Sequence, residues 1–279
     1  MSGARWRFRP GQAALQATLV LGCGVTLFPL GVMLSMAAKD PAQIYARFWN
    51  LPAPVRWENF AFGIDATLRY VLNSMVVSGA VCALTLLVAM FAAYAFSVHR
   101  FAGRRLLFMA VIALMMVPGI LMLVPLFLTV RGLGLINTWG GLIWPQVAAS
   151  LPIAIFLMRN FFDEIPRDLF DTARIDGARE WQVLRHVVAP LSTPILSTVA
   201  IINVLGSWNN YIWPLLVVRD ASLRTIPLGL AFLETEFYLR LRPGMSMAAY
   251  AMATVPMLVF FLCAMRPFIK GMTSGAIKG

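Results

Sequence analysis

The chain has 279 residues, of which 60% are hydrophobic and 13% charged, with a mean hydropathy of +0.77. Because soluble domains carry about 25% charged residues, this composition excludes an ordinary soluble protein and indicates an integral membrane protein. The net charge of +11 does not indicate nucleic-acid binding, since the basic residues are dispersed between apolar runs, as the positive-inside bias of membrane proteins explains.

Six windows are long and uncharged enough to span a bilayer, which takes about 20 apolar residues. They cover residues 10–38, 70–98, 106–130, 132–158, 190–218 and 243–265. The third and fourth windows are separated only by Arg131 and the turn-like GLGLINTWGG, which favours two antiparallel spans over one long helix. The sequence therefore predicts an all-α membrane protein with six transmembrane helices, forming a single transmembrane domain over 1–279.

The distribution of Lys and Arg between alternate connections predicts the orientation. One side of the six-span arrangement holds both termini and the connections 99–105 and 159–186, with fourteen of the 23 basic residues. They are Arg5, Arg7, Arg9, Arg100, Arg104, Arg105, Arg159, Arg167, Arg174, Arg179, Arg185, Arg266, Lys270 and Lys278. Both termini are therefore expected in the cytoplasm.

Two sizeable connections, 39–69 and 219–242, lie on the opposite side in this arrangement. The first carries Trp49, Trp57 and Phe60, which form either an interfacial aromatic belt or a docking surface. The belt is favoured, because interfacial Trp is common in membrane proteins.

The longest charge-dense stretch, 166–194, reads PRDLFDTARIDGAREWQVLRHVVAPLSTP and is too polar for hydrocarbon. It predicts two short helices around a turn. Pro166 suits the first turn of a helix, and Gly177 suits a helix end that needs positive φ. A second helix is expected over about 178–189, before Pro190 interrupts the pattern.

This predicted hairpin could seat in a groove of another protein or rest on the bilayer. Its acidic residues disfavour the second alternative, because anionic lipid surfaces attract basic segments. The apolar side chains available for docking are Leu169, Phe170, Trp181 and Leu184.

Polar residues in the fifth window form a predicted stripe. Asn203, Ser207 and Asn210 stand at i, i+4 and i+7 and would share one face of a helix. The stripe could line a cavity or form an interhelical hydrogen-bonding seam, and the pattern does not decide between them. Asn73 and Ser74 in the second window are a weaker pair, for which the structural role is favoured.

Aromatic residues beside these amides and hydroxyls suit an uncharged polyhydroxylated ligand. The aromatics are Trp208, Tyr211 and Trp213. No charged residue lies in the core of any window, which disfavours a proton relay. No GxxxxGK[ST] loop is present, so ATP, if it drives the protein, must bind another subunit. The alternatives are a stand-alone secondary transporter or channel and a structural assembly subunit.

Residues 171–190, DTARIDGAREWQVLRHVVAP, resemble the EAA loop of permease subunits of prokaryotic ATP-binding-cassette (ABC) importers. In that loop EAAxxxG is followed nine residues later by IxLP. Asp171, Thr172 and Ala173 stand at EAA, Gly177 stands at the glycine, and 187–190 stand at IxLP. The departures, Asp for Glu, Thr for Ala, Val for Ile and Ala for Leu, are mild.

Three further stretches are similar to the carbohydrate-importer branch, which contains the second permease of maltose-type systems. They are AYAFSVHRFAGRRLLF at 93–108, LGSWNNYIWPLLV at 205–217 and RPFIKGMTSGAIKG at 266–279. The resemblance covers nearly the whole chain and is less specific for sugars than for the superfamily, because glycerol-phosphate and polyol importers look much the same.

The resemblance implies a type I ABC importer permease in the prokaryotic plasma (inner) membrane, with a conserved five-helix core over 69–266 and a cytoplasmic coupling loop over 166–190 between spans four and five. The implied partners are a homologous second permease, two ATP-binding subunits, an extracytoplasmic solute-binding protein and a carbohydrate substrate. ATP and Mg are expected on the partner subunits, with no cofactor, catalytic residue or metal ligand in this chain.

Two groups of site residues follow. The residues expected to couple to the ATPase are Asp171, Thr172, Ala173, Asp176, Gly177, Ala178, Trp181 and Pro190. Those expected on the substrate path are Asn73, Asn203, Gly206, Ser207 and Asn210.

Overall fold

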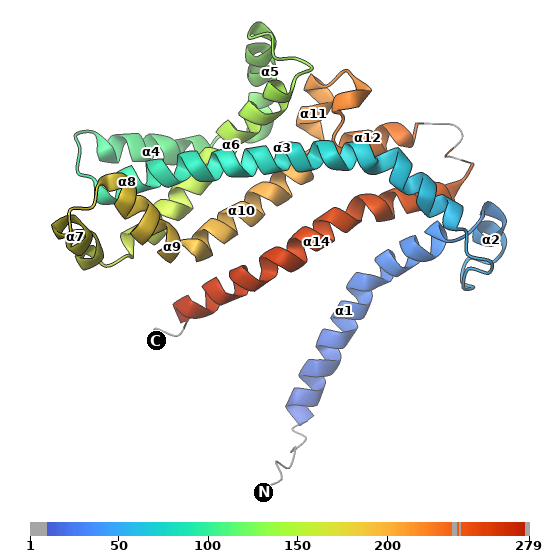
Figure 1. Ribbon diagram of the computed structural model, residues 1–279. Helices are drawn as coiled ribbons and strands as arrows, with labels where there is room; N and C mark the ends of the chain where they lie inside the picture. Colours follow the sequence, from blue (N-terminus) through green and yellow to red (C-terminus); the bar gives the residue numbers. More distant parts are fainter. Residues whose placement is uncertain (1–9, 236–238, 240, 277–279) are drawn as a thin grey trace, which may run out of the picture. The chain divides into compact units, whose positions relative to one another are not determined.

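The structure is a computed structural model that describes residues 10–235, 239 and 241–276, with side chains described only within 11–265. All secondary-structure elements in this part of the chain are helices (Figure 1). The terminal basic residues Arg5, Arg7, Arg9 and Lys278, used above to predict orientation, lie outside the described residues.

Among the described residues, four helices are long and apolar enough to cross a membrane, and two bent helix pairs raise the number to six if each pair is one span. The four are α1 (Pro10–Ala37), α3 (Trp57–Val98), α6 (Trp139–Asp163) and α14 (Pro243–Ala276). The prediction of an all-helical chain with several apolar spans is confirmed, whereas the count of six stays a prediction.

The remaining elements are short helices in the connections and in the bent pairs. They are α2 (Pro41–Ala46), α4 (Arg104–Met115), η1 (Gly119–Met122), α5 (Leu123–Gly132), α7 (Arg167–Ile175), α8 (Glu180–Val183), the π-helical turn η2 (Leu184–Val188), α9 (Ala189–Leu191), α10 (Thr193–Trp208), α11 (Ile212–Val217), η3 (Ala221–Leu223) and α12 (Ile226–Leu233).

The third predicted window is not a straight helix. Helix α4 and the pair η1 and α5 are bent by 94° at a break before Gly119. Pro118 causes the break, because it lacks an N–H and disfavours helical backbone at the preceding Val117. The predicted window over 106–130 is therefore a bent pair of helices.

The fifth window is also interrupted. The segment α8 to α9 is bent by 79° against α10, and α10 ends at Trp208, with Asn209 as its C-cap. Asn210 follows the end of that helix, so the predicted single helix face for Asn203, Ser207 and Asn210 is wrong. Uncharged composition identified an apolar segment correctly but could not locate a break inside it.

Helix α3 begins at Trp57, well inside the connection predicted over 39–69. Its first turns carry the charged residues Glu58, Asp65 and Arg69, which ended the predicted window but do not end a helix. Trp57 and Phe60 therefore lie one turn apart on α3, with ring centroids 5.8 Å apart.

The chain divides into two compact units, residues 1–67 with 232–254, and residues 68–231 with 255–279. In the first unit Asp40 caps α2 and accepts a hydrogen bond from the Gln43 backbone N–H at 2.8 Å. This hydrogen bond lowers the pKa of Asp40, and Arg56 lies 3.2 Å from the same carboxylate.

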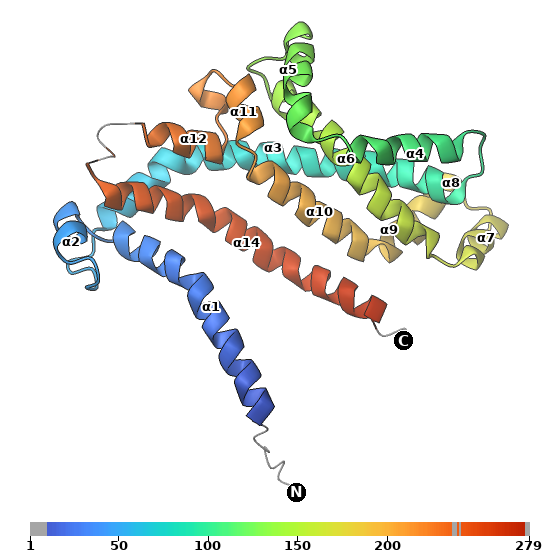
Figure 2. The same cartoon turned by 180° about the vertical axis from the view of Figure 1, so that it is seen from behind.

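The second unit holds two apolar clusters. The larger joins α3 and α6 to α7, α8, η2 and α10, and the smaller joins α3, α5 and α6 to α11. Helices α7 to α9 lie by the C-terminal ends of α3 and α6 in both views (Figures 1 and 2). The charged hairpin is thus packed on the spans of its own unit.

The start of α6 depends on Gly141. A Cβ at this position would lie 2.2 Å from the backbone oxygen of Leu135, whereas at Gly140 the nearest atom would be the movable Cδ2 of Leu135 at 3.4 Å. Overpacking against backbone costs about 1–3 kcal/mol.

We expect Gly141→Ala to lower the thermal unfolding midpoint of the purified protein in detergent, with Gly140→Ala as the neighbouring control. Equal midpoints for the two variants would contradict the close approach.

Candidate functional site

The charged hairpin over 166–191 turns at Gly177. Gly177 has φ +78°, its N–H donates to the Arg174 oxygen, and the Ala178 N–H donates to the Ala173 oxygen, both at 3.0 Å. These two bonds form a Schellman motif, which satisfies carbonyls at the end of α7. The prediction of two short helices around a Gly177 turn is confirmed, and Pro166 stands immediately before the first of them.

A π-helical turn lets the second half of the hairpin pass Pro190. The ring of a proline clashes with the carbonyl four residues earlier in a regular helix. Here the turn over Leu184–Val188 is widened, and the Ala189 N–H bonds the Leu184 oxygen instead. The chain then bends at Ser192, where the hairpin meets α10.

Two of the four side chains predicted to be available for docking are buried in this chain. Phe170 is 1% exposed and Leu184 is 2% exposed, and both belong to the larger apolar cluster. Leu169 and Trp181 remain exposed at 42% and 52%, although the Trp181 ring stacks on Phe91 of α3 at 6.1 Å. The expectation for Phe170 and Leu184 is wrong, because the hairpin needs them to hold it on the spans.

The sequence reasoning missed Ile175, the last residue of α7, whose side chain is 86% exposed. Its position as an isolated aliphatic residue between Arg174 and Asp176 could have indicated from the sequence that it is exposed. Its exposure beside the Gly177 turn makes it the most prominent apolar group of the hairpin.

A hollow of about 330 Å³ opens at the turn. Four of the residues expected to couple to an ATPase lie in its wall, together with side chains of the second half of the hairpin. These residues are Ala173, Asp176, Gly177, Ala178, Gln182, Val183, His186 and Val187. Asp171, Thr172, Trp181 and Pro190 are exposed residues of the same hairpin that are not in the wall.

The predicted substrate-path residues occupy different surroundings. Asn203 and Ser207 are buried in α10, and no partner among the described residues bonds Asn203 Oδ1 or Ser207 Oγ. Gly206 is exposed, with open space where a Cβ would stand. Asn73 instead donates to the backbone oxygens of Ser222 and Arg224, at 2.7 and 2.9 Å. Asn73 thus anchors the connection that follows α11 to helix α3.

Asn210 lies in the break between α10 and α11. Its Nδ2 donates to Gln146 Oε1 at 3.2 Å, and its Oδ1 accepts from the Trp213 backbone N–H at 3.3 Å. The indole N–H of Trp213 donates to the Gly141 oxygen at 2.9 Å. Gln146 is a buried amide in α6 that the sequence did not single out, because spans were recognised by the absence of charged residues and Gln is uncharged.

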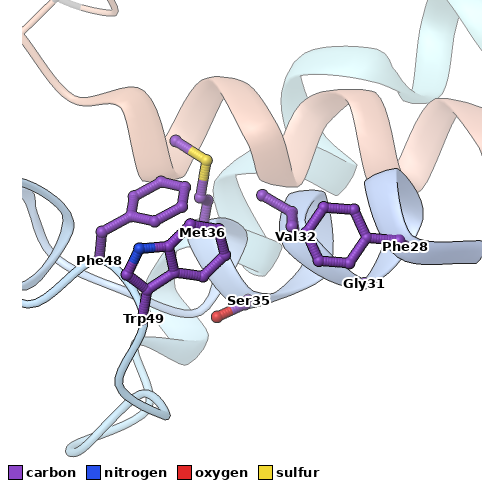
Figure 3. Close-up of a pocket in the computed structure, with 7 residues that line it drawn as sticks. All are labelled: Phe28, Gly31, Val32, Ser35, Met36, Phe48 and Trp49. Carbon is purple, nitrogen blue, oxygen red and sulfur yellow. The ribbon is translucent and has the colours of Figure 1, made fainter. Parts of the chain in front are cut away.

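Three aromatic residues of the first unit line a different hollow, of about 230 Å³ (Figure 3). Trp49 lies over it, with its ring 6.4 Å from that of Phe28 and 4.9 Å from that of Phe48. Its wall is formed by Phe28, Gly31, Val32, Ser35, Met36, Phe48 and Trp49. The Ser35 hydroxyl and the Trp49 indole N–H are the polar side-chain groups of this wall, which is otherwise apolar. Among the described residues, no three His, Cys, Asp or Glu side chains are grouped to hold a metal ion.

Comparisons with known proteins agree with the sequence motifs. The family model described as "Binding-protein-dependent transport system inner membrane component" matches residues 85–273. The arabinooligosaccharides transport system permease protein AraQ of Bacillus subtilis is 33% identical over 259 residues, covering 91% of both chains. The trehalose transport system permease protein SugB of Mycobacterium tuberculosis is 33% identical and covers 95% of this chain and 97% of the relative.

A solved structure has the same fold. It is a crystal structure of a bacterial ABC transporter involved in the import of the acidic polysaccharide alginate. The similarity covers 94% of this chain and 99% of that chain, with a TM-score of 0.75 and 22% identity.

The Gly177 turn gives a direct test of the hairpin geometry. Left-handed backbone costs a β-branched residue about 1–2 kcal/mol, whereas Asn adopts it readily. We expect Gly177→Val to lower the thermal unfolding midpoint in detergent and Gly177→Asn to stay close to the parent. Since a Cβ meets no atom within 4 Å there, equal loss in both variants would contradict a backbone cause.

Proposed function

The chain belongs to the family of binding-protein-dependent transport system inner membrane components, and from this premise we propose that it is the permease subunit of an ATP-driven sugar importer. It is a multi-pass protein of the plasma (inner) membrane, in keeping with its family and its apolar helices. The sugar reaches it from an extracytoplasmic solute-binding protein. A homologous second permease and two ATP-binding subunits complete the assembly.

The proposed topology has six spans with both termini in the cytoplasm. The broken segments 104–132 and 190–218 are the third and fifth spans. The basic residues of the connections support this orientation, since Lys and Arg are retained in the cytoplasm. In this arrangement the charged hairpin projects into the cytoplasm between the fourth and fifth spans.

The hairpin is the proposed coupling element. The observation that carries this role is the exposure of Ile175 beside the hollow at Gly177. Ile175 is the most exposed large apolar residue of the hairpin, ahead of Leu169 and Trp181. An exposed aliphatic anchor next to a hollow lined by both apolar and polar side chains fits a groove of a partner protein. ATP and Mg bind the partner, and closure of the ATPase subunits displaces the hairpin and exposes the substrate cavity alternately to each side.

The proposed substrate path runs along α10 and the break that follows it. Asn203 and Ser207 offer unpaired polar atoms, Gly206 leaves open space, and Asn210 continues the path through its amide. Amides and hydroxyls beside aromatic faces match the hydroxyl groups and apolar faces of sugar rings. Asn73 is retained in the proposed path because it lies on α3, although its amide donates to the backbone oxygens of Ser222 and Arg224.

A neutral carbohydrate is the favoured substrate. The relatives are named for arabinooligosaccharides and trehalose, and the side chains proposed for the path carry no charge. A polyol or glycerol-phosphate is the second candidate, and the phosphate would call for an Arg or Lys on the path.

Reconstitution tests the proposed function. Proteoliposomes containing this chain, the second permease and the ATPase subunits should take up sugar only with ATP and the loaded binding protein. Ile175→Ser should lower uptake and retention of the ATPase subunits about tenfold, the effect of losing one apolar anchor of an interface. Ile175→Leu serves as the control. ATP-independent uptake by this chain alone would instead indicate a secondary transporter.

The substrate path has its own test. Asn210→Ala should raise the sugar concentration for half-maximal uptake about tenfold, the effect of losing one hydrogen bond. Asn209→Ala is the matched control, because Asn209 is exposed and its amide donates to the Leu205 oxygen of its own helix. Unchanged uptake kinetics in an intact Asn210→Ala complex would mean that Asn210 only joins helices.

A further inference from the structure

One carboxylate joins three segments beside the turn of the charged hairpin. Glu180, the first residue of α8, accepts a hydrogen bond from the Tyr94 hydroxyl at 2.5 Å. His99 Nε2 lies 3.6 Å from this same oxygen, and the other oxygen accepts from Arg174 Nη2 at 3.2 Å. Tyr94 belongs to α3, Arg174 to α7, and His99 follows the end of α3.

The bond to Tyr94 differs from the other two in burial. Tyr94 is 5% exposed and belongs to the larger apolar cluster, so its hydroxyl is held in place by packing. Its ring meets the His99 ring edge-on at 5.4 Å. The Arg174 and His99 side chains are about 40% exposed and that of Glu180 is 51% exposed, so the contacts of Glu180 with Arg174 and His99 contribute little. The bond from Tyr94 therefore fixes Glu180 relative to α3.

A second carboxylate lies at the other end of the hairpin. Asp163, the last residue of α6, accepts from Ser97 Oγ at 2.6 Å and pairs with Arg159 at 3.0 Å. Arg167, the first residue of α7, donates to the Ser97 oxygen at 3.2 Å. The C-terminal turns of α3 thus bind both halves of the hairpin through polar side chains.

We propose that Glu180 is a positioning residue that transmits displacement of the hairpin to α3 through the Tyr94 hydroxyl. Apolar packing holds the hairpin on the spans but is not directional, so it permits sliding of one surface on the other. A hydrogen bond from a buried hydroxyl to a carboxylate is short and directional, and it opposes such sliding. This inference rests on the proposed function, because it needs a partner that moves the hairpin.

Tyr94→Phe is the sharpest test, since it removes one hydroxyl and keeps the buried ring. In the reconstituted importer we expect ATP hydrolysis to continue while sugar transported per ATP falls about tenfold, the fold-change for one hydrogen bond to a charged group. Glu180→Gln should lower the same ratio. If both residues act through one bond, the double variant should lose no more than the more impaired single variant.

Matched controls come from residues without such a bond. Tyr45→Phe changes an exposed tyrosine, and Glu164→Gln changes an exposed acid between α6 and α7. Both should keep the parental ratio. An unchanged ratio in Tyr94→Phe, a parallel fall of hydrolysis and uptake, or loss of the complex in both variants would overturn the proposal. Absence of ATP-dependent uptake in the parent would instead overturn the proposed function.

Discussion

Hydrocarbon excludes unpaired charge, and this constraint arranges the whole chain. The predicted spans carry no Asp, Glu, Lys or Arg in their cores, so charged side chains collect in the connections. The densest of these connections is the hairpin between α6 and α10. A protein with no nucleotide-binding loop and no charge inside its spans has few places where a partner could transfer work to it. The hairpin is the segment proposed to receive it.

Burial of apolar side chains holds the hairpin against the spans of its own unit. Phe170 and Leu184 belong to the larger cluster, whereas Ile175 and its charged neighbours Arg174 and Asp176 are exposed. The proposed coupling role needs both properties, because a hairpin that docks on a partner must also stay attached to the spans that it would move. The carboxylates of Glu180 and Asp163 add direction to this packing where the hairpin meets α3.

The buried amides and hydroxyls of the helices differ in whether they have a hydrogen-bond partner. A buried amide or hydroxyl without a partner is costly, and most are paired. Asn73 and Gln146 follow that rule, since each is bonded by the backbone or by another amide. Asn203 Oδ1 and Ser207 Oγ do not. Their cost is consistent with a role for a ligand or a neighbouring chain.

The sequence by itself determined the apolar segments, the charged hairpin and its Gly177 turn, because composition and positive φ are local properties. It could not decide where helices break inside uncharged runs, so the bends at Pro118 and Ser192 and the end of α10 at Trp208 came from the structure. Nor could it tell outward from inward apolar residues of the hairpin. Burial of Phe170, exposure of Ile175 and the bond from Tyr94 to Glu180 depend on contacts between segments distant in sequence, which only tertiary packing brings together.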